Sequence, residues 1–225
     1  MGLAIITGGN SGLGFEMAKL LRSLDINICL LGRDDLKLKT SSEFVKSIQG
    51  KGDVDAYRID ISSEDEVRAF GKYLRDKGQE VEYLFNAAGV GRFGPPDEMK
   101  RSDIDEVLSS NLIGMMLLTG ELLSLMSHKR SRIINILSTA AKVGKAGEAL
   151  YCASKWGARG YTKALQAHYK NTNIKVMAVY PGGMDTPFWS EQVTSDYMNP
   201  GQVAKQIVDT AISDLYISEL VIERH

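Results

Sequence analysis

Short apolar runs alternate with longer amphipathic segments along the whole chain. Most of the runs are rich in residues that favour strands and are nearly continuous in apolar residues, as expected where both faces of a sheet are covered. They predict strands over residues 3–7, 27–31, 55–59, 83–87, 132–138, 175–180 and 215–223. The segments between them predict helices over residues 12–24, 35–48, 63–77, 102–127, 149–170 and 200–213.

This regular alternation predicts a single α/β domain over residues 1–225. Right-handed crossovers place helices on both faces of a parallel sheet, so we expect a Rossmann-type doubly wound sheet of about seven strands. Residues 181–199 form the longest irregular segment and contain aromatic and methionine residues. This segment either covers a ligand or is an ordinary surface connection.

Composition excludes several classes of function. A hydrophobic fraction of 44% supplies a sizeable core, and a net charge of −1 provides no field that favours nucleic acid or membrane. No run approaches the length of apolar residues that a membrane helix needs. The two cysteines have no metal-site spacing and indicate a reducing compartment. We expect a cytoplasmic protein with no metal and no nucleic-acid or membrane partner.

The first predicted strand runs into the glycine-rich sequence TGGNSGLG, which precedes a predicted helix. Glycine allows a tight turn and a close approach to a pyrophosphate, and the helix N-terminus offers free N–H groups to phosphate. A glycine cluster alone can be a plain turn, but the strand-turn-helix context favours dinucleotide binding. The expected cofactor contacts are Thr7, Gly8, Asn10, Ser11, Gly12, Leu13 and Gly14.

The end of the second predicted strand bears on the choice of cofactor. Gly32 occupies the position where an acidic residue would bind the ribose 2′-hydroxyl, and Arg33, which follows, suits a 2′-phosphate. This favours NADP(H), with NAD(H) possible if Asp34 or Asp35 binds the ribose instead of capping the next helix. Asp60, followed by Ile61, either accepts a hydrogen bond from the adenine or caps the helix near residue 63.

Further motifs occur in a fixed order: NAAG at 86–89, Asn111, Ser138, YCASK at 151–155 and PGGMDT at 181–186. Together with TGGNSGLG, they resemble the single-domain branch of the short-chain dehydrogenase/reductase family. Each motif alone is weak, whereas their joint appearance over most of the chain is specific.

The resemblance implies a catalytic role for four residues. Tyr151 would be the general acid/base, and Lys155, one helical turn away, would lower its pKa and hold the nicotinamide ribose. Ser138 would hydrogen-bond the substrate oxygen, and Asn111 would position a water next to Lys155. Taken singly, each has a structural explanation, such as a surface helix pair, a strand-end cap or a polar packing residue.

Two loops complete the expected site. Asn86, Ala87, Ala88 and Gly89 would allow close approach of the cofactor, although tight strand-to-loop packing also explains small residues there. By the same resemblance, Pro181, Gly182, Met184 and Thr186 would contact the nicotinamide carboxamide, and a plain proline-glycine turn is the alternative.

These features predict an oxidoreductase that moves a hydride between NADP(H) and a small-molecule carbonyl or secondary alcohol, in particular a carbonyl reductase. The alternatives are a non-catalytic dinucleotide sensor on the same fold and an epimerase or dehydratase. We expect residues 90–100, 139–150 and 181–199 to shape an apolar or aromatic substrate pocket that includes Phe188, Trp189 and Tyr197. The resemblance also implies a homodimer or homotetramer.

Overall fold

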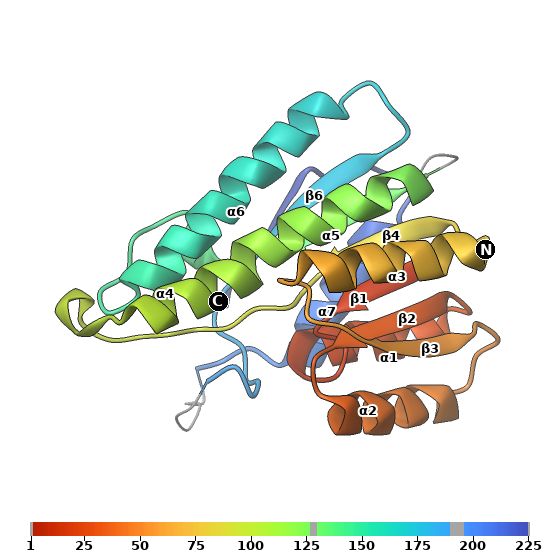
Figure 1. Ribbon diagram of the computed structural model, residues 1–225, viewed down its shortest axis with the longest axis horizontal. Coiled ribbons are helices and arrows are strands. Elements are labelled where there is room, and N and C mark those ends of the chain that lie inside the picture. The colour runs from red at the N-terminus through yellow and green to blue at the C-terminus, as the bar shows by residue number, and fades with distance from the viewer. Residues whose placement is uncertain (1, 127–129, 190–195, 225) are drawn as a thin grey trace.

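All seven predicted strands are present and pair in parallel, in the order β3-β2-β1-β4-β5-β6-β7 (Figure 1). The computed structural model describes residues 2–126, 130–189 and 196–224. The strands are β1 (Leu3–Thr7), β2 (Asn27–Gly32), β3 (Val54–Arg58), β4 (Val81–Asn86), β5 (Arg132–Ile136), β6 (Lys175–Pro181) and β7 (Glu219–Ile222).

Helices cover both faces of the sheet, which confirms the predicted fold class. They are α1 (Gly12–Ser23), α2 (Asp35–Ser47), α3 (Glu64–Asp76), α4 (Arg101–Leu108), α5 (Gly114–Leu122), α6 (Ala149–His168) and α7 (Pro200–Ile212). Alternation along the strands divides the core: Ala4 and Ile6 of β1 face the layer of α1, α2 and α7, whereas Leu3 and Ile5 face α3, α5 and α6. Figure 1 shows α3, α5 and α6 lying across the near face.

The sequence pattern misplaced several boundaries. The helix expected over 102–127 is interrupted by a π-helical turn at Ser109–Ile113 and ends in a 3₁₀ turn at Leu123–Leu125, and residue 127 lies outside the described residues. The last strand begins at 219 rather than 215, because β6 pairs with it only from Ala178 onward.

The helical stretch Arg101–Leu125 is long and apolar enough, by length and composition alone, to cross a membrane. This differs from the expectation that no such segment exists. A core helix passes the same test, and here Val107, Met115, Leu118 and Leu122 are buried within the fold. Packing within the fold accounts for these buried residues, whereas only 39% of the apolar stretch is buried and Ile113 and Met116 are exposed.

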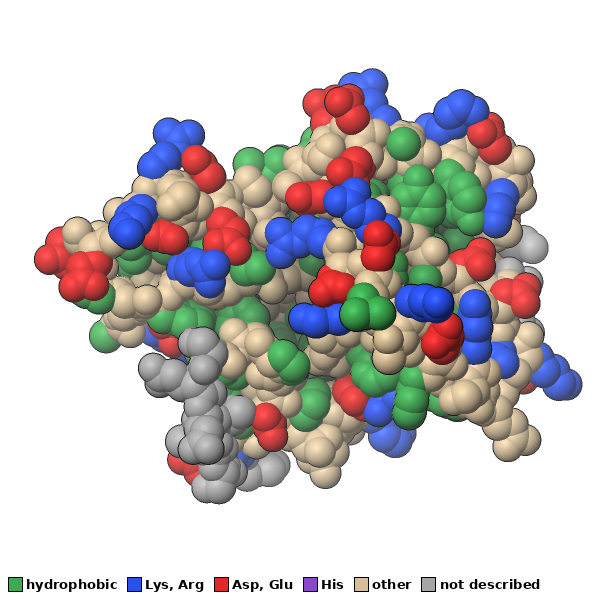
Figure 2. Space-filling model, turned by 60° about the horizontal axis from the view of Figure 1, so that its bottom comes forward, with side chains coloured by type: hydrophobic (Ala, Val, Ile, Leu, Met, Phe, Trp, Pro, Cys, Tyr) green, Lys and Arg blue, Asp and Glu red, His purple; other side chains and the backbone are tan. Residues whose placement is uncertain are grey.

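Charged residues of both signs are interspersed on the face shown in Figure 2. Pairs of opposite charge one helical turn apart occur on exposed helix surfaces, such as Lys72 with Asp76 and Arg101 with Asp105. Exposed pairs of this kind contribute little to stability individually. The mixture of signs on this face agrees with the nearly neutral charge of the sequence.

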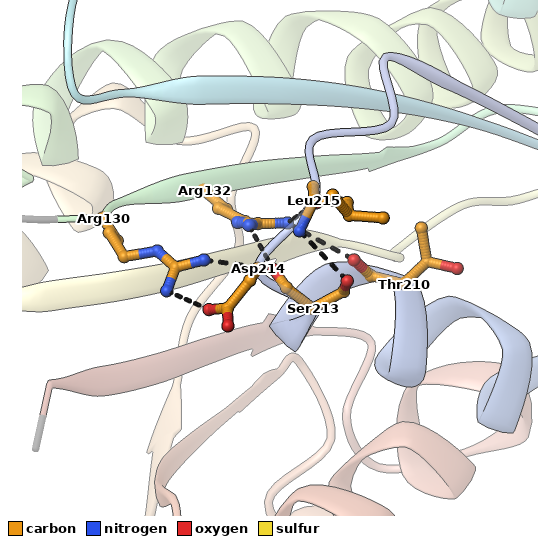
Figure 3. Close-up of polar contacts among 6 residues, drawn as sticks. All are labelled: Arg130, Arg132, Thr210, Ser213, Asp214 and Leu215. Atoms are coloured by element: carbon orange, nitrogen blue, oxygen red, sulfur yellow. Dashed lines mark hydrogen bonds and ion pairs between the residues drawn. The ribbon is translucent and has the colours of Figure 1, made fainter.

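The C-terminal end of α7 is held to the beginning of β5 by two arginines (Figure 3). Arg132 is buried, and its guanidinium donates hydrogen bonds to the carbonyls of Thr210, Ser213 and Leu215. Arg130, in contrast, is exposed; it forms an ion pair with Asp214 and is a second donor to the carbonyl of Ser213, at 3.2 Å. The carbonyls at a helix C-terminus have no partner within the helix, so Arg132 satisfies groups that would otherwise lack one.

We predict that Arg132→Met lowers the free energy of unfolding by about 1–3 kcal/mol, because three carbonyls lose a buried donor. Arg130→Met is the matched control, and we expect a much smaller change because its ion pair is exposed. Urea denaturation at neutral pH measures both. Equal destabilisation by the two variants would contradict the role given to Arg132.

Candidate active site

A cavity of about 610 Å³ opens at the carboxyl ends of the central strands. Strand β1 lies between β2 and β4, so the chain leaves β1 towards one edge of the sheet and later returns at β4 on the other side. In open α/β sheets the crevice at such a reversal is where ligands bind. The cavity is lined by residues that follow β1, β4, β5 and β6, including Gly8, Ala87, Ser138 and Gly182.

The ends of β1 and β4 are joined by the hydroxyl of Thr7. Its Oγ1 accepts hydrogen bonds from the backbone N–H groups of Ala87 and Ala88, each at 2.9 Å. Thr7 is itself buried and does not line the cavity. In this structure Thr7 contacts the loop after β4, so it positions the part of the cavity lining that Ala87 and Ala88 form.

The glycine-rich turn forms a cradle that larger residues would fill. Gly8 and Gly12 have φ angles of 66° and 50°, in the region that favours glycine. A Cβ on Gly14 would lie 2.4 Å from the carbonyl oxygen of Gly8. The first turn of α1 contains no acidic residue, and Ser11 makes no side-chain capping bond. The exposed amides and positive helix end therefore fit a pyrophosphate.

Ser138, Tyr151 and Lys155 meet at the floor of the cavity. Ser138 lies two residues beyond the end of β5, where its Oγ accepts a bond from the N–H of Ala140 and interacts with the Tyr151 phenol. Lys155 lies one turn along α6 and donates from Nζ to the carbonyl of Ile136 at 3.1 Å. Its Nζ is 5.7 Å from the centre of the Tyr151 ring.

Burial controls the ionisation of both α6 residues. Burial raises the pKa of the Tyr151 phenol well above its ordinary value, and the hydrogen bond with Ser138 opposes this only in part. Burial also lowers the pKa of Lys155 to about 8. In the protein chain by itself, burial is thus the largest influence on the Tyr151 pKa, and the lowering expected from Lys155 stays a prediction for the cofactor-bound enzyme.

Asn111 lies in the π-helical turn and holds the loop that follows β4. Its side-chain amide exchanges two hydrogen bonds with the backbone of Val90, accepting at 2.8 Å and donating at 2.9 Å. It also donates to the hydroxyl of Ser154. Gly89 fits beneath it, since a Cβ there would lie 3.2 Å from the Asn111 oxygen and 3.7 Å from Lys155 Nζ. Asn111 thus fixes this loop beside Lys155.

The structure brings most of the predicted cofactor residues to the cavity surface. Those that line it are Gly8, Ser11, Gly12, Leu13, Gly14, Ala87, Ala88, Gly89, Tyr151, Lys155, Pro181, Gly182, Met184 and Thr186. Those outside the lining are Thr7, Asn10, Arg33, Asp60, Ile61 and Asn86. Asn10 packs against Gly32, and buried Asn86 donates to Asn135 and Thr119.

The acidic residues near the adenosine end have structural partners. Asp34 caps α2 by accepting from the N–H of Lys37 at 3.0 Å, and Asp60 accepts from the N–H and hydroxyl of Ser62. Burial alone would raise the pKa of Asp60, but the bonds from Ser62 and the charge of Arg33 hold it below its usual range. The capping role considered for Asp34 is therefore confirmed, whereas Asp60 does not cap α3, because Ser63 is the N-cap of that helix and accepts from the N–H of Glu66.

Sequence reasoning missed several lining residues. Lys37, on the first turn of α2, lines the cavity, as do Lys145 and Glu148 in the loop before α6. A lone charged residue in a loop or on a helix carries no motif, so only the folded arrangement identifies it. Phe188, Trp189 and Tyr197 do line the cavity, as expected, whereas residues 190–195 of the same segment lie outside the described residues.

Comparison with known proteins agrees with this geometry. The short chain dehydrogenase family model matches residues 2–196. A granaticin polyketide synthase protein of Streptomyces violaceoruber, named as a ketoacyl reductase, is 35% identical over 91% of this chain and 75% of its own length. Sepiapterin reductase of Chlorobaculum tepidum is 28% identical over 98% of this chain and 95% of its own.

A solved structure also matches the whole chain. A metagenomic short-chain oxidoreductase in complex with NADP has a TM-score of 0.86 and 29% identity, covering 100% of this chain and 97% of the other. The fold and its relatives define an NAD(P)-dependent oxidoreductase. The chain belongs to the short-chain dehydrogenase family, which confirms the resemblance seen in the motifs.

We predict that the burial of Lys155 reduces stability at neutral pH. Its folded-state pKa of about 8 lies below the ordinary 10.5, so the folded state binds the proton less tightly than the unfolded state. The resulting cost is full below about pH 8 and disappears as the pH rises through about 10.5. Lys155→Met should therefore raise the free energy of unfolding by about 1–3 kcal/mol at pH 7, even after the Ile136 carbonyl loses its donor.

The difference should shrink when urea denaturation is repeated near pH 10. Lys163→Met, on the exposed side of the same helix, controls for a general effect of replacing lysine and should not stabilise the protein. A Lys155→Met variant less stable than the wild type at pH 7 would contradict the account.

Proposed function

We propose that this protein reduces a carbonyl compound to a secondary alcohol with NADPH as the preferred cofactor. The observation that carries the proposal is the arrangement of Ser138, Tyr151 and Lys155 on the floor of one cavity, beside a glycine cradle. A dinucleotide sensor would need the cradle but not a buried tyrosine paired with a serine hydroxyl at the reactive end. This argument favours an enzyme over the sensing alternative.

The residues divide the work of the reaction. The bound cofactor would supply the hydride. Tyr151 donates its proton to the carbonyl oxygen, and Ser138 stabilises the negative charge that develops on that oxygen. The phenol is protonated at neutral pH even at its ordinary pKa, and because burial raises that pKa, its proton transfer depends on the stabilisation of the phenolate that Lys155 and the bound cofactor would supply. Lys155 would hold the ribose hydroxyls and offset the charge left on the phenol.

The preference for NADPH rests on charge at the adenosine end. Gly32 ends β2 without an acidic side chain, and Arg33 follows it directly. Lys37 lies one helical turn further along and lines the cavity. Two cations at this point would favour a 2′-phosphate over a hydroxyl. The NADP complex of the metagenomic relative supports the same assignment.

The reaction itself is tested by following NADPH absorbance with a panel of aldehydes and ketones. We expect measurable oxidation of NADPH by the wild type and a loss of at least about 10²-fold in kcat for Tyr151→Phe, since general acid catalysis contributes about 10²–10⁴-fold. The variant should still bind NADPH, because the ring and its packing remain. Unchanged turnover in Tyr151→Phe, or no turnover with any carbonyl, would contradict the proposal.

The cofactor preference is tested with single substitutions on and near α2. Arg33→Ala and Lys37→Ala should each raise KM for NADPH by about 10-fold, with little effect on KM for NADH, because each removes a cation that contacts only the phosphate. Lys39→Ala, an exposed lysine of the same helix that does not line the cavity, is the control. Equal changes for both cofactors would exclude a 2′-phosphate site here.

A further inference from the structure

The rings of Tyr151, Phe188 and Trp189 line the reactive end of the cavity, and Phe93 packs against all three. Phe93, in the loop after β4, stacks on Trp189, in the loop after β6, with ring centres 5.1 Å apart and planes inclined by 17°. Phe188 lies 5.9 Å from Phe93 and 5.5 Å from Tyr151. Phe93 also meets the edge of Tyr151 at 5.7 Å. We call Phe93, Phe188 and Trp189 the aromatic clamp.

The backbone around the clamp is shaped to admit these rings. A Cβ on Gly91 would lie 2.6 Å from the Phe93 ring and 2.8 Å from the Phe188 ring, so a side chain at this position would displace both. Trp189 is fixed from the other side, where its Nε1 donates to the carbonyl of Met184 at 3.0 Å. The space above Gly91 and the hydrogen bond to Met184 therefore set the positions of the three rings of the aromatic clamp.

The loop that carries Phe93 is tied down at two points. Arg92 forms an ion pair with Glu106 of α4 at 2.7 Å, and the N–H of Gly94 donates to the carbonyl of Gly147 at 2.8 Å. Even so, 41% of Phe93 remains exposed to solvent. Phe93 itself does not line the cavity, but the Phe188 and Trp189 rings against which it packs do, and these half-buried rings offer apolar area to a ligand.

Charge at this end of the cavity favours a neutral ligand. The two exposed charged residues of the loop before α6 that line the cavity, Lys145 and Glu148, have opposite signs. They provide no net charge to attract an acidic or a basic substrate. The aromatic rings are then the main basis for discrimination.

We propose that the aromatic clamp selects neutral carbonyl substrates that carry an aromatic ring close to the carbonyl group. This inference rests on the proposed carbonyl reduction. The substrate ring packs against Phe188 and Trp189, which Phe93 holds in place, and the carbonyl then lies beside Tyr151 and Ser138. Aromatic pairs contribute about 0.5–1.5 kcal/mol beyond the area they bury, so a flat ring gains from this surface what a saturated ring of similar size does not.

Phenylacetone and cyclohexylacetone test this directly. Both are neutral methyl ketones with one methylene between ring and carbonyl, so the reactivity of their carbonyl groups is similar. We expect the wild type to favour phenylacetone in kcat/KM by about 5-fold or more. Phe93→Leu and Trp189→Leu should each reduce this ratio by about 2- to 10-fold. Phe44→Leu, at an exposed phenylalanine of α2, should leave the ratio unchanged.

A binding measurement provides a readout independent of turnover. The chain has two tryptophans, so Trp156→Phe leaves Trp189 as the sole tryptophan. With NADP⁺ present, which cannot give a hydride to a ketone, phenylacetone should change the fluorescence of Trp189, whereas cyclohexylacetone should have little effect. The same experiment on Trp156→Phe combined with Phe93→Leu should show a smaller response.

The outcomes separate this inference from the proposed function. Reduction of both ketones with equal kcat/KM, or a ratio that Phe93→Leu and Trp189→Leu leave unchanged, overturns the aromatic clamp and leaves carbonyl reduction standing. Reduction of aliphatic carbonyls but not of phenylacetone would also overturn the aromatic clamp and leave carbonyl reduction standing. No oxidation of NADPH with these ketones or with a broad carbonyl panel overturns the proposed function and the clamp together.

Discussion

The reversal of strand order at β1 is the constraint on which the site depends. Because β2 and β4 lie on opposite sides of β1, the loops that leave these strands diverge and open a crevice at their carboxyl ends. Thr7 fixes the width of this crevice by bonding the amides that follow β4. The cradle of the glycine-rich turn, the loop held by Asn111 and the start of α6 all lie around it.

At the reactive end of the crevice, ionisable residues proposed for catalysis are buried, and the burial of Lys155 lowers the stability of the fold. Lys155 is buried with one carbonyl as its acceptor, and Tyr151 is buried against Phe188. Each is shifted towards its neutral form by burial. With a pKa of about 8 the amine stays mostly protonated at neutral pH, and ribose hydroxyls would stabilise that buried charge. The fold therefore supplies the buried site, and the bound cofactor would supply the remaining partners of Tyr151 and Lys155.

The sequence predicted the sheet well because each strand is an apolar run and each helix a periodic one, and these local patterns determine the layers. The resemblance of its motifs to a known family also assigned Ser138, Tyr151 and Lys155 to one site, and all three line the cavity. The sequence missed the π-helical turn at Ser109–Ile113, since one extra residue within a turn leaves the apolar pattern of a helix intact.

Other features arise only when distant segments meet. The pKa of Tyr151 is raised because the folded chain buries its phenol, and the spacing of residues in the sequence does not reveal that burial. Phe93 and Trp189 are far apart in the chain and meet only across the folded cavity. Lys37 adds a cation that no motif marks. The roles of the individual site residues and the homodimer or homotetramer stay predictions.

Transfer of deuterium from NADPH labelled at C4 of the nicotinamide tests the central claim most directly. The account predicts that mass spectrometry finds one deuterium on the carbinol carbon of the alcohol, delivered from only one face of the nicotinamide ring, since the cavity holds the cofactor in one orientation. Alcohol product without deuterium from either labelled face, or cofactor binding with no product from any carbonyl, would contradict it.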